Sequence, residues 1–392
     1  MKINIEVQHL CSNVLGGVPY YTINLIEALV NRNLNEYSVS FFDGNRELNN
    51  RAYIERYLKN PISNGLKILE CNDLSYKNIV EESIKGACAS YADKTYSEYF
   101  KNDFDMCHLP VSLGIAENIT QKTIVTVHDI LPVLPKFKMA WNERTQTILE
   151  RTLQYIKNHK DINVIADSLS TKNDIMKYFD ISSERIHVVP LGYDVNQYYP
   201  DKNKSIINPL GITGPYLLYL GRLDLRKGIV DILDAFEVLK EKRKDLTLVL
   251  AGAFDTSATV IKERLNNYKY LEDVILPGFV TLEQKRALMS GAEIFLFPSE
   301  YEGFGLPVLE AMACGTPVIT TNVSSLPEVG GDAVLYVGPK NPEELAEAIQ
   351  KILNSETIRN EYIQKGFEQC KKFSWDKTAE MTEEVYKIAF NK

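Results

Sequence analysis

PSEYEGFGLPVLEAMACGTP, residues 298–317, follows an apolar run that predicts a buried strand at Glu293–Phe297. The sequence Gly303-Phe304-Gly305 predicts a turn, and Pro307 suits the first turn of a helix that runs to Ala313. Such a helix directs its first main-chain N–H groups, and the positive end of its dipole, toward the preceding loop. The stretch therefore predicts an anion-binding site at the carboxyl end of a strand.

Two carboxylates flank this turn. Glu302 precedes it, and Glu310 lies a little over one turn into the predicted helix. We expect the two side chains to reach different parts of one ligand rather than to form a close acid/base pair. Carboxylates are good acceptors for sugar hydroxyls, so the spacing suits a ligand with hydroxyls at both ends.

A second strand–loop–helix unit lies upstream. The apolar run Tyr216–Leu220 leads into the loop Gly221–Gly228, and a predicted helix follows. Gly221 lets the backbone turn and approach a ligand closely. Arg222 and Lys227 are then expected at the carboxyl edge of the sheet, where the two cations could bind a diphosphate. A charged surface loop is the alternative interpretation of these residues alone.

Strands alternate with helices along the whole chain, which predicts parallel sheets with helical crossovers. In the second half the predicted strands are Tyr216–Leu220, Leu246–Ala251, Val274–Leu276, Glu293–Phe297 and Pro317–Thr320. In the first half they are Lys2–Glu6, Tyr37–Phe42, Met106–Leu109, Thr123–Val127, Asn163–Ala166 and Arg185–Val189. The polar stretch Asp194–Pro209 suits an interdomain linker.

Composition narrows the class of protein. The chain has 392 residues, 45% of them hydrophobic and 24% charged, with a formal net charge of −8. This length predicts two domains, and the acidic charge argues against a nucleic-acid partner. Six scattered cysteines and an early polar N-terminus predict a reduced, cytoplasmic protein, and no apolar run approaches the ~20 residues that span a bilayer. The basic and aromatic segment Pro135–Trp141 leaves a peripheral contact with the inner face of the membrane open.

A histidine and an aspartate follow the predicted strand Thr123–Val127. His128 and Asp129 stand just past its end, where side chains reach ligands in sheets of this kind. The alternative interpretation is a capping histidine held by Asp129. Asp129 either orients His128 or satisfies the turn.

These motifs resemble the retaining glycosyltransferases of family 4, also called glycosyl transferase group 1. The stretch Glu302–Glu310 resembles their E-x7-E signature, and Gly221–Gly228 resembles their phosphate-binding strand–loop–helix. Further matches lie at Asp167–Ser170, Val189–Asp194 and Phe373–Asp376. The second half of the chain is covered almost continuously, whereas residues 44–104 carry no known signature.

The resemblance implies an α/β fold of the GT-B class, in which two Rossmann-like, doubly wound domains face each other across a cleft. Residues 1–200 would form the acceptor-side domain, with a C-terminal helix at 375–392 packing back on it. Residues 210–374 would form the domain that binds the nucleotide sugar.

The resemblance also implies roles for individual residues. The catalytic set would be Arg222 and Lys227 on the diphosphate, Glu302 on the transferred sugar, and His128 at the donor sugar. Glu310 would bind the ribose hydroxyls. The other substrate-binding positions would be Gly16, Gly17, Gly221, Phe279, Val280, Gly303, Phe304, Gly305 and Leu306.

The expected chemistry is hexose transfer with retention of the anomeric configuration. Arg222, Lys227 and the helix N-terminus would stabilise the departing nucleoside diphosphate. That phosphate can itself accept the acceptor's proton, so no general base is assigned; Glu302 as a covalent nucleophile is a second option. No metal or other cofactor is expected, because Asp103-Phe104-Asp105, a D-x-D sequence, precedes the strand Met106–Leu109 and is interpreted as structural.

Three other classes of protein are alternatives to a sugar transferase. An oxidoreductase is disfavoured because neither half contains G-x-G-x-x-G. A sugar-nucleotide epimerase of the same architecture and a non-catalytic nucleotide-sugar-binding scaffold stay as alternatives. The form His128–Pro132 resembles bacterial mannosyltransferases of surface polysaccharide synthesis, so GDP-mannose is the first candidate donor ahead of a UDP-hexose. A glycan or lipid-linked molecule is the expected acceptor.

Overall fold

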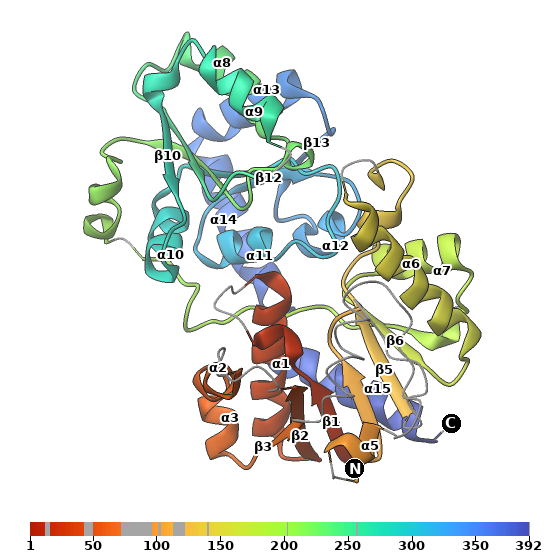
Figure 1. The fold of residues 1–392 in the computed structure, drawn as a ribbon. Coiled ribbons are helices and arrows are strands. Elements are labelled where there is room, and N and C mark those ends of the chain that lie inside the picture. Colours follow the sequence, from red (N-terminus) through yellow and green to blue (C-terminus); the bar gives the residue numbers. More distant parts are fainter. Residues whose placement is uncertain are drawn as a thin grey trace. The chain divides into compact units, whose positions relative to one another are not determined.

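The computed structural model describes residues 1–11, 16–42, 50–71, 96–100, 103–112, 122–138, 141–201, 203–255 and 258–391. The chain divides into two compact units, each built on its own parallel sheet. One unit holds Met1–Gly192 together with Trp375–Lys392, and the other holds Tyr193–Ser374. Figure 1 shows this division in colour, because the blue C-terminal helix lies among the red and orange elements of the first unit.

The sheet of the second unit has the strand order β10-β9-β8-β11-β12-β13, with every pair parallel. Apolar residues dominate β8, β9 and β11, and most of their side chains are buried, as expected for strands covered on both faces. The strands are β8 (Tyr216–Leu220), β9 (Thr247–Ala251), β10 (Val274–Gly278), β11 (Ile294–Phe297), β12 (Val318–Thr321) and β13 (Leu335–Val337). The chain winds outward from β8 in one direction and from β11 in the other, so the topological switch point lies between these two strands.

Helices connect the strands of the second unit. They are α8 (Ile229–Lys240), α9 (Thr259–Asn266), α10 (Leu282–Gly291), α11 (Leu306–Ala313), α12 (Leu326–Gly330), α13 (Pro342–Leu353) and α14 (Glu356–Cys370). Several begin at a side-chain cap; Thr281 and Gln284, for example, form a capping box at the start of α10. The unit also takes in residues 193–200, which the sequence analysis assigned to the first domain, because Tyr198 bonds to helix α10.

The sheet of the first unit has the order β3-β2-β1-β4-β5-β6-β7, again with every pair parallel. Its strands are β1 (Lys2–Glu6), β2 (Glu36–Phe42), β3 (Lys67–Cys71), β4 (Met106–Leu109), β5 (Lys122–Val127), β6 (Asn163–Ala166) and β7 (Ile186–Val188). Its helices are α1 (Gly17–Arg32), α2 (Asn50–Tyr57), α3 (Lys59–Ser63), α5 (Tyr96–Phe100), α6 (Glu143–Asn158), α7 (Leu169–Phe179) and α15 (Trp375–Asn391). Both sheets therefore confirm the expected doubly wound α/β class.

The sequence analysis missed several elements. Strands β3 and β13 were not predicted, nor were the helices α2, α3, α5, α7, α12 and α14. The strands that were predicted lie within two residues of their observed bounds. Helix α14 buries only Gly366, Gln369 and Cys370, which form no continuous apolar stripe at helical spacing. Its position in the fold, rather than its own pattern, makes it a helix.

Helix α15 is held to the first unit by a buried carboxylate. Glu383 is 1% exposed and accepts hydrogen bonds from the Tyr37 hydroxyl at 2.8 Å and from Arg32 Nε at 2.9 Å. Thr378 adds a bond from its hydroxyl to the Pro190 carbonyl at 2.8 Å. Because helix α15 also packs on α1 and on strands β5 and β6, the last helix is part of the core of the first unit.

We predict that Glu383→Ala lowers the free energy of unfolding of the first unit by about 2 kcal/mol, because it leaves the Tyr37 hydroxyl and the Arg32 guanidinium without their acceptor. The only two tryptophans, Trp141 and Trp375, lie in this unit, so tryptophan fluorescence in a urea titration reports its unfolding. Glu384→Ala is the control, because Glu384 is exposed and pairs with Lys387 on the same helix; a change within about 0.5 kcal/mol is expected there. Equal effects of the two substitutions would contradict the prediction.

Candidate functional site

Two loops meet at the switch point of the second unit. The loop Gly221–Gly228 follows β8, and the loop Pro298–Gly305 follows the neighbouring strand β11. In open parallel sheets the crevice beyond the carboxyl ends of strands at a switch point is the usual ligand site. The described residues therefore bring the two motifs of the sequence analysis to one edge of one sheet.

Close backbone contacts join the two loops. Gly228 has φ +70°, and a Cβ atom there would lie 2.4 Å from the Pro298 carbonyl oxygen. The Glu300 amide donates to the Arg226 carbonyl at 2.8 Å, and Arg226 Nη1 donates to the Tyr301 carbonyl at 3.0 Å. Only glycine fits at position 228, so any larger residue there would push the loops apart.

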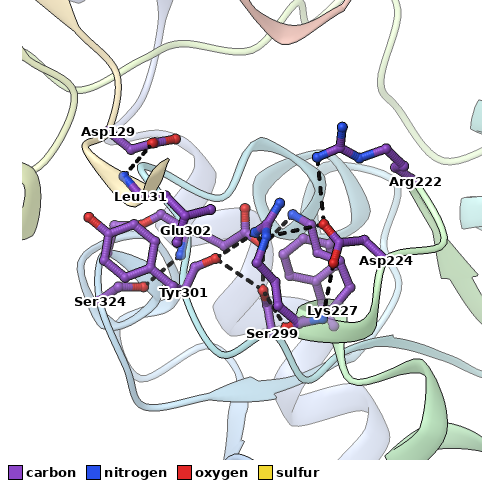
Figure 2. A network of polar contacts seen from close by, with 12 residues as sticks. Asp129, Leu131, Arg222, Asp224, Lys227, Ser299, Tyr301, Glu302 and Ser324 are labelled. Carbon is purple, nitrogen blue, oxygen red and sulfur yellow. Dashed lines mark hydrogen bonds and ion pairs between the residues drawn. The ribbon is translucent and has the colours of Figure 1, made fainter. Parts of the chain in front are cut away.

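A buried ion pair lies at the centre of this junction (Figure 2). Lys227 Nζ donates to Glu302 Oε1, and the Ser299 hydroxyl donates to the same oxygen at 2.5 Å. The side chains of Lys227 and Glu302 are each 13% exposed, and Arg226 Nη1 lies 3.8 Å from Glu302. Burial favours the neutral carboxyl, but the charges of Lys227 and Arg226 outweigh it and hold the pKa of Glu302 below its ordinary value. Burial and the Arg226 charge lower the pKa of Lys227.

Hydroxyl groups at the end of strand β12 and in the turn after it fix the Glu302 loop. The Thr321 hydroxyl donates to the Ser299 carbonyl at 2.5 Å, and the Ser324 hydroxyl accepts from the Glu302 amide at 2.9 Å. The Ser325 hydroxyl donates to the carbonyls of Glu302 and Phe304, at 2.9 and 2.6 Å. None of these hydroxyls was a sequence candidate. The run TTNVSS, residues 320–325, which spans the end of buried strand β12 and the turn after it, could have indicated these hydroxyls.

The turn into helix α11 has the predicted form. Gly305 has φ +117° and immediately precedes the helix, in which Pro307 is the second residue. The Phe304 ring is buried against Phe373, with ring centroids 5.9 Å apart. Phe304 can therefore offer a ligand its main chain, together with Gly303, Gly305 and Leu306, while its ring belongs to the core.

Arg222 differs from Lys227 in being exposed. Its side chain is 48% exposed, with Nε 3.1 Å from Asp255 Oδ2 and Nη2 3.5 Å from Asp224 Oδ2. Asp224 also lies 3.2 Å from Arg226 Nε and accepts from the Arg226 amide, so it orders the loop after Gly221. Arg226, which the sequence analysis did not select, is the better buried of the two arginines.

The remaining candidates of the second unit lie on α11 and just after strand β10. Glu310 is buried on α11 and accepts from Lys285 Nζ at 2.6 Å, so the two candidate carboxylates have different cation partners. Phe279 follows edge strand β10 and is 88% exposed, with Val280 beside it. An aromatic ring so exposed at the carboxyl end of a strand offers a flat surface for stacking.

In the first unit, His128 is held by a residue that the sequence analysis did not assign. His128 Nδ1 lies 2.7 Å from Asp167 Oδ2, and Nε2 lies 2.9 Å from the Pro110 carbonyl oxygen. Asp129 instead accepts the Leu131 amide at 2.9 Å, so it satisfies the turn (Figure 2). Thr171 adds a bond from its hydroxyl to the His128 carbonyl at 3.2 Å.

These contacts fix where the protons of His128 lie. A carbonyl only accepts, so Nε2 carries a hydrogen, and Nδ1 shares a second proton with Asp167. Burial lowers the pKa of His128, but the charge and hydrogen bond of Asp167 raise it more, and the net shift is upward. Neither ring nitrogen has a lone pair free for a general base.

A buried polar network continues behind His128. The His108 ring lies 2.7 Å from the Tyr386 hydroxyl of α15 and 2.8 Å from the Thr126 hydroxyl, which in turn lies 3.0 Å from the Tyr21 hydroxyl. Burial, with the nearby His128 charge, lowers the pKa of His108 to about 3. His108 is therefore a neutral core histidine that links β4 to α15.

Two further candidates of the first unit, and one residue of the D-x-D sequence, can also be placed. Gly16 and Gly17 are exposed at the start of α1, and a Cβ atom at either would meet no described atom within 4 Å. Asp105 accepts the Lys2 amide at 2.8 Å, just before β4, as part of the sheet. Among the described residues no group of three or more histidines, cysteines, aspartates or glutamates could hold a metal ion.

Comparison with known proteins agrees with this geometry. Residues 202–369 match the family described as glycosyl transferases group 1. O-antigen chain mannosyltransferase B of Escherichia coli is 29% identical over 274 residues, which cover 68% of this chain and 71% of that protein. Serotype-specific mannosyltransferase WbdA of Escherichia coli is 28% identical over 69% of this chain, but the match spans only 34% of that longer protein.

A solved structure extends the likeness to the whole chain. HepE of Anabaena, in complex with UDP and glucose, has a TM-score of 0.73, 18% sequence identity and 99% coverage of both chains. The fold is therefore that of the GT-B glycosyltransferases. Residues 202–369 match the glycosyl transferases group 1 family, so the resemblance to that group stated from the motifs is confirmed.

No helix among the described parts of the chain is both long enough and apolar enough to cross a membrane.

We predict strong coupling between Lys227 and Glu302. Lys227→Met and Glu302→Gln each break a buried pair, so each is expected to destabilise the second unit, the lysine change by about 3 kcal/mol. The double variant should lose at least about 1 kcal/mol less than the sum, because it leaves no unpaired charge. Calorimetric unfolding of the four proteins measures the coupling. Additive losses would show that the pair contributes nothing as a pair.

We also predict that His108 makes the first unit sensitive to acid. Its pKa of about 3 in the folded state lies below that of an unfolded histidine, about 6.5, so its contribution to stability rises with pH between these values. His108→Gln should lower the slope of the free energy of unfolding against pH. The largest change expected is about 1.4 kcal/mol per pH unit, which corresponds to one proton. Urea titrations at pH 4.5, 5.5 and 6.5, followed by tryptophan fluorescence, measure the slope.

Wild type and His108→Gln share every other titratable group, so the difference between their slopes reports His108 alone. Burial raises the pKa of Glu6 to about 7. Glu6 therefore contributes less to the stability of the folded protein as the pH rises through the same range, and it does so equally in both proteins. An unchanged slope in His108→Gln would mean that His108 is protonated in the folded protein.

Proposed function

We propose that this chain is a retaining glycosyltransferase that moves a hexose from a nucleoside diphosphate sugar to a glycan or lipid-linked acceptor. One observation carries the proposal: Arg222 and Lys227 lie with Glu302 at the switch point of the second unit, beside the N-terminus of α11. Cations at a helix N-terminus suit a diphosphate, and carboxylates suit sugar hydroxyls.

In this proposal each group binds a different part of the donor. An ammonium has three hydrogens, so Lys227 can hold Glu302 and a phosphate oxygen together. Arg222 binds the diphosphate from the exposed side, and the amides that begin α11 complete its contacts. Glu310 accepts the ribose hydroxyls, and the exposed ring of Phe279, with Val280, receives the base.

The proposed chemistry needs no general base from the protein. The bond between the anomeric carbon and the phosphate oxygen breaks, and its electron pair stays on the leaving diphosphate. The acceptor oxygen bonds to the same face of the anomeric carbon, and its proton passes to the departing phosphate. Preorganised cations lower the energy of this charge separation, which often supplies the largest share of catalysis. The ring nitrogens of His128 are both engaged, which agrees with a role in contact rather than in proton transfer.

Mannose is the first candidate sugar, and bacterial surface polysaccharide the first candidate product. Two Escherichia coli relatives are named as mannosyltransferases, one of them for the O-antigen chain. The HepE structure, by contrast, holds UDP and glucose, so the base and the sugar need a direct test. We propose that the reaction requires no metal ion.

We predict that one nucleoside diphosphate among GDP, UDP and ADP raises the melting temperature of the wild-type protein in metal-free buffer. Ligand at about 100 times its dissociation constant stabilises the folded state by about 2.7 kcal/mol. Arg222→Ala should lose most of this shift and keep its own melting temperature, because an exposed ion pair contributes little to stability. The sugar conjugates of the binding nucleotide then name the transferred hexose.

Arg243→Ala is the matched control. Arg243 is also exposed and also pairs with an aspartate, Asp245, but it lies beyond the C-terminal end of α8, away from the loop that precedes that helix. Its nucleotide shift should equal that of wild type. No shift with any nucleotide, in a folded sample, would exclude the transferase and favour a scaffold. Binding followed by release of an altered nucleotide sugar without transfer would favour an epimerase.

A further inference from the structure

Residues after the unit boundary are fastened to helix α10. The Tyr198 hydroxyl accepts from Lys285 Nζ at 2.9 Å, and the same ammonium lies 4.9 Å from the centre of the Tyr198 ring. Asp201 accepts from Nε and Nη2 of Arg286, both at 3.2 Å. The segment Tyr198–Asp201, which we call the clasp, is therefore bound by two neighbouring cations of one helix.

Lys285 has a second partner inside the proposed donor site. Its ammonium donates to Glu310 Oε2 at 2.6 Å. The side chain of Glu310 is 4% exposed and that of Lys285 is 21% exposed, while Tyr198 is 3% exposed overall. Helices α10 and α11 both begin at the carboxyl edge of the same sheet, and the two charged residues lie about one turn into each.

We propose that Lys285 is a positioning residue of the donor site, which holds the Glu310 carboxylate in the orientation that receives the ribose hydroxyls of the nucleotide. The inference rests on the proposed function, because it assigns Glu310 to the ribose. It adds a residue that belongs to neither sequence motif and that ties the ribose carboxylate to the clasp.

Burial explains why the carboxylate needs this partner. An ionised carboxylate removed from water is stable only when it is paired and hydrogen-bonded. Lys285 supplies both through one oxygen, Oε2, and its own ammonium is fixed by the Tyr198 hydroxyl. The N-terminal turn that carries Lys285 is itself held by the capping box of Thr281 and Gln284. Without the ammonium, nothing charged would fix the orientation of the buried carboxylate, and it would be free to turn toward water.

The test compares binding of a nucleotide with and without its ribose hydroxyls. GDP and UDP are titrated by calorimetry against the full chain, and the tighter of the two is compared with its 2′,3′-dideoxy counterpart. Wild type should prefer the ribose form by about tenfold or more, since hydrogen bonds to a charged acceptor are strong. Lys285→Met should reduce this preference to within about twofold, while its affinity for the dideoxy form stays within about twofold of wild type.

Two further variants separate positioning from a general effect. Lys285→Arg should restore most of the preference, because the guanidinium keeps the charge. Arg286→Met, the next residue on the helix, contacts the clasp but is bonded to Asp201 rather than to Glu310, so it should keep the full preference. Should the methionine variant melt below the assay temperature, Lys285→Gln is measured in its place, with the same loss expected.

Each other outcome overturns the inference. An unchanged preference in Lys285→Met would show that Glu310 does not depend on Lys285. An equal loss for ribose and dideoxy forms would assign Lys285 to the phosphates or to the fold. A wild type that binds nucleotide without preferring ribose would remove the ribose role of Glu310 alone. A wild type that binds no nucleotide would remove the proposed function as well.

Discussion

The ion pair between Lys227 and Glu302 is the contact on which the second unit's site depends. It joins the loops after β8 and β11, the two strands from which the chain winds in opposite directions. Strands β8 and β11 are neighbours in the sheet but are not consecutive in the chain. Chain connectivity alone therefore does not hold the loops that follow them together. A buried pair of opposite charges, with the close approach of Gly228 to Pro298, prevents this. The hydroxyls of Ser324 and Ser325 then hold the Glu302 main chain from a third strand.

The central strands β8, β9 and β11 of the second unit could be predicted because they are apolar and buried on both faces. Runs such as Tyr216–Leu220 are apolar throughout, and each ends at a glycine or a charged loop, so neither type nor place was ambiguous. Strand β3 could not be found in this way. Its sequence, Lys67–Cys71, mixes charged and apolar residues on an edge strand, and it becomes a strand by pairing with β2.

Site residues could be predicted from the sequence where they lie in one motif. They could not be predicted where two segments far apart in the sequence come together in the fold. Glu302 and Glu310 stand in a single motif. The partner of His128, however, lies 39 residues away, at the end of the next strand in the sheet. Val127 pairs with Ala166, so the residues that follow each strand, His128 and Asp167, come side by side. Had the strand order been known, Asp167 rather than Asp129 would have been predicted as the partner of His128. Lys285 escaped notice for the same reason, since nothing near it in the sequence resembles a site.

The return of helix α15 to the first unit affects how the chain is made. During synthesis residues 1–192 leave the ribosome well before the helix that supplies Glu383 and Tyr386 to their core. The second unit, whose residues are contiguous, can fold while the first still exposes the faces of α1, β5 and β6 that α15 covers. Domains that fold during translation usually do so in order from the N-terminus. Here the first unit cannot complete its core until α15 has been made, so the faces that α15 covers stay open while residues 193–374 are synthesised.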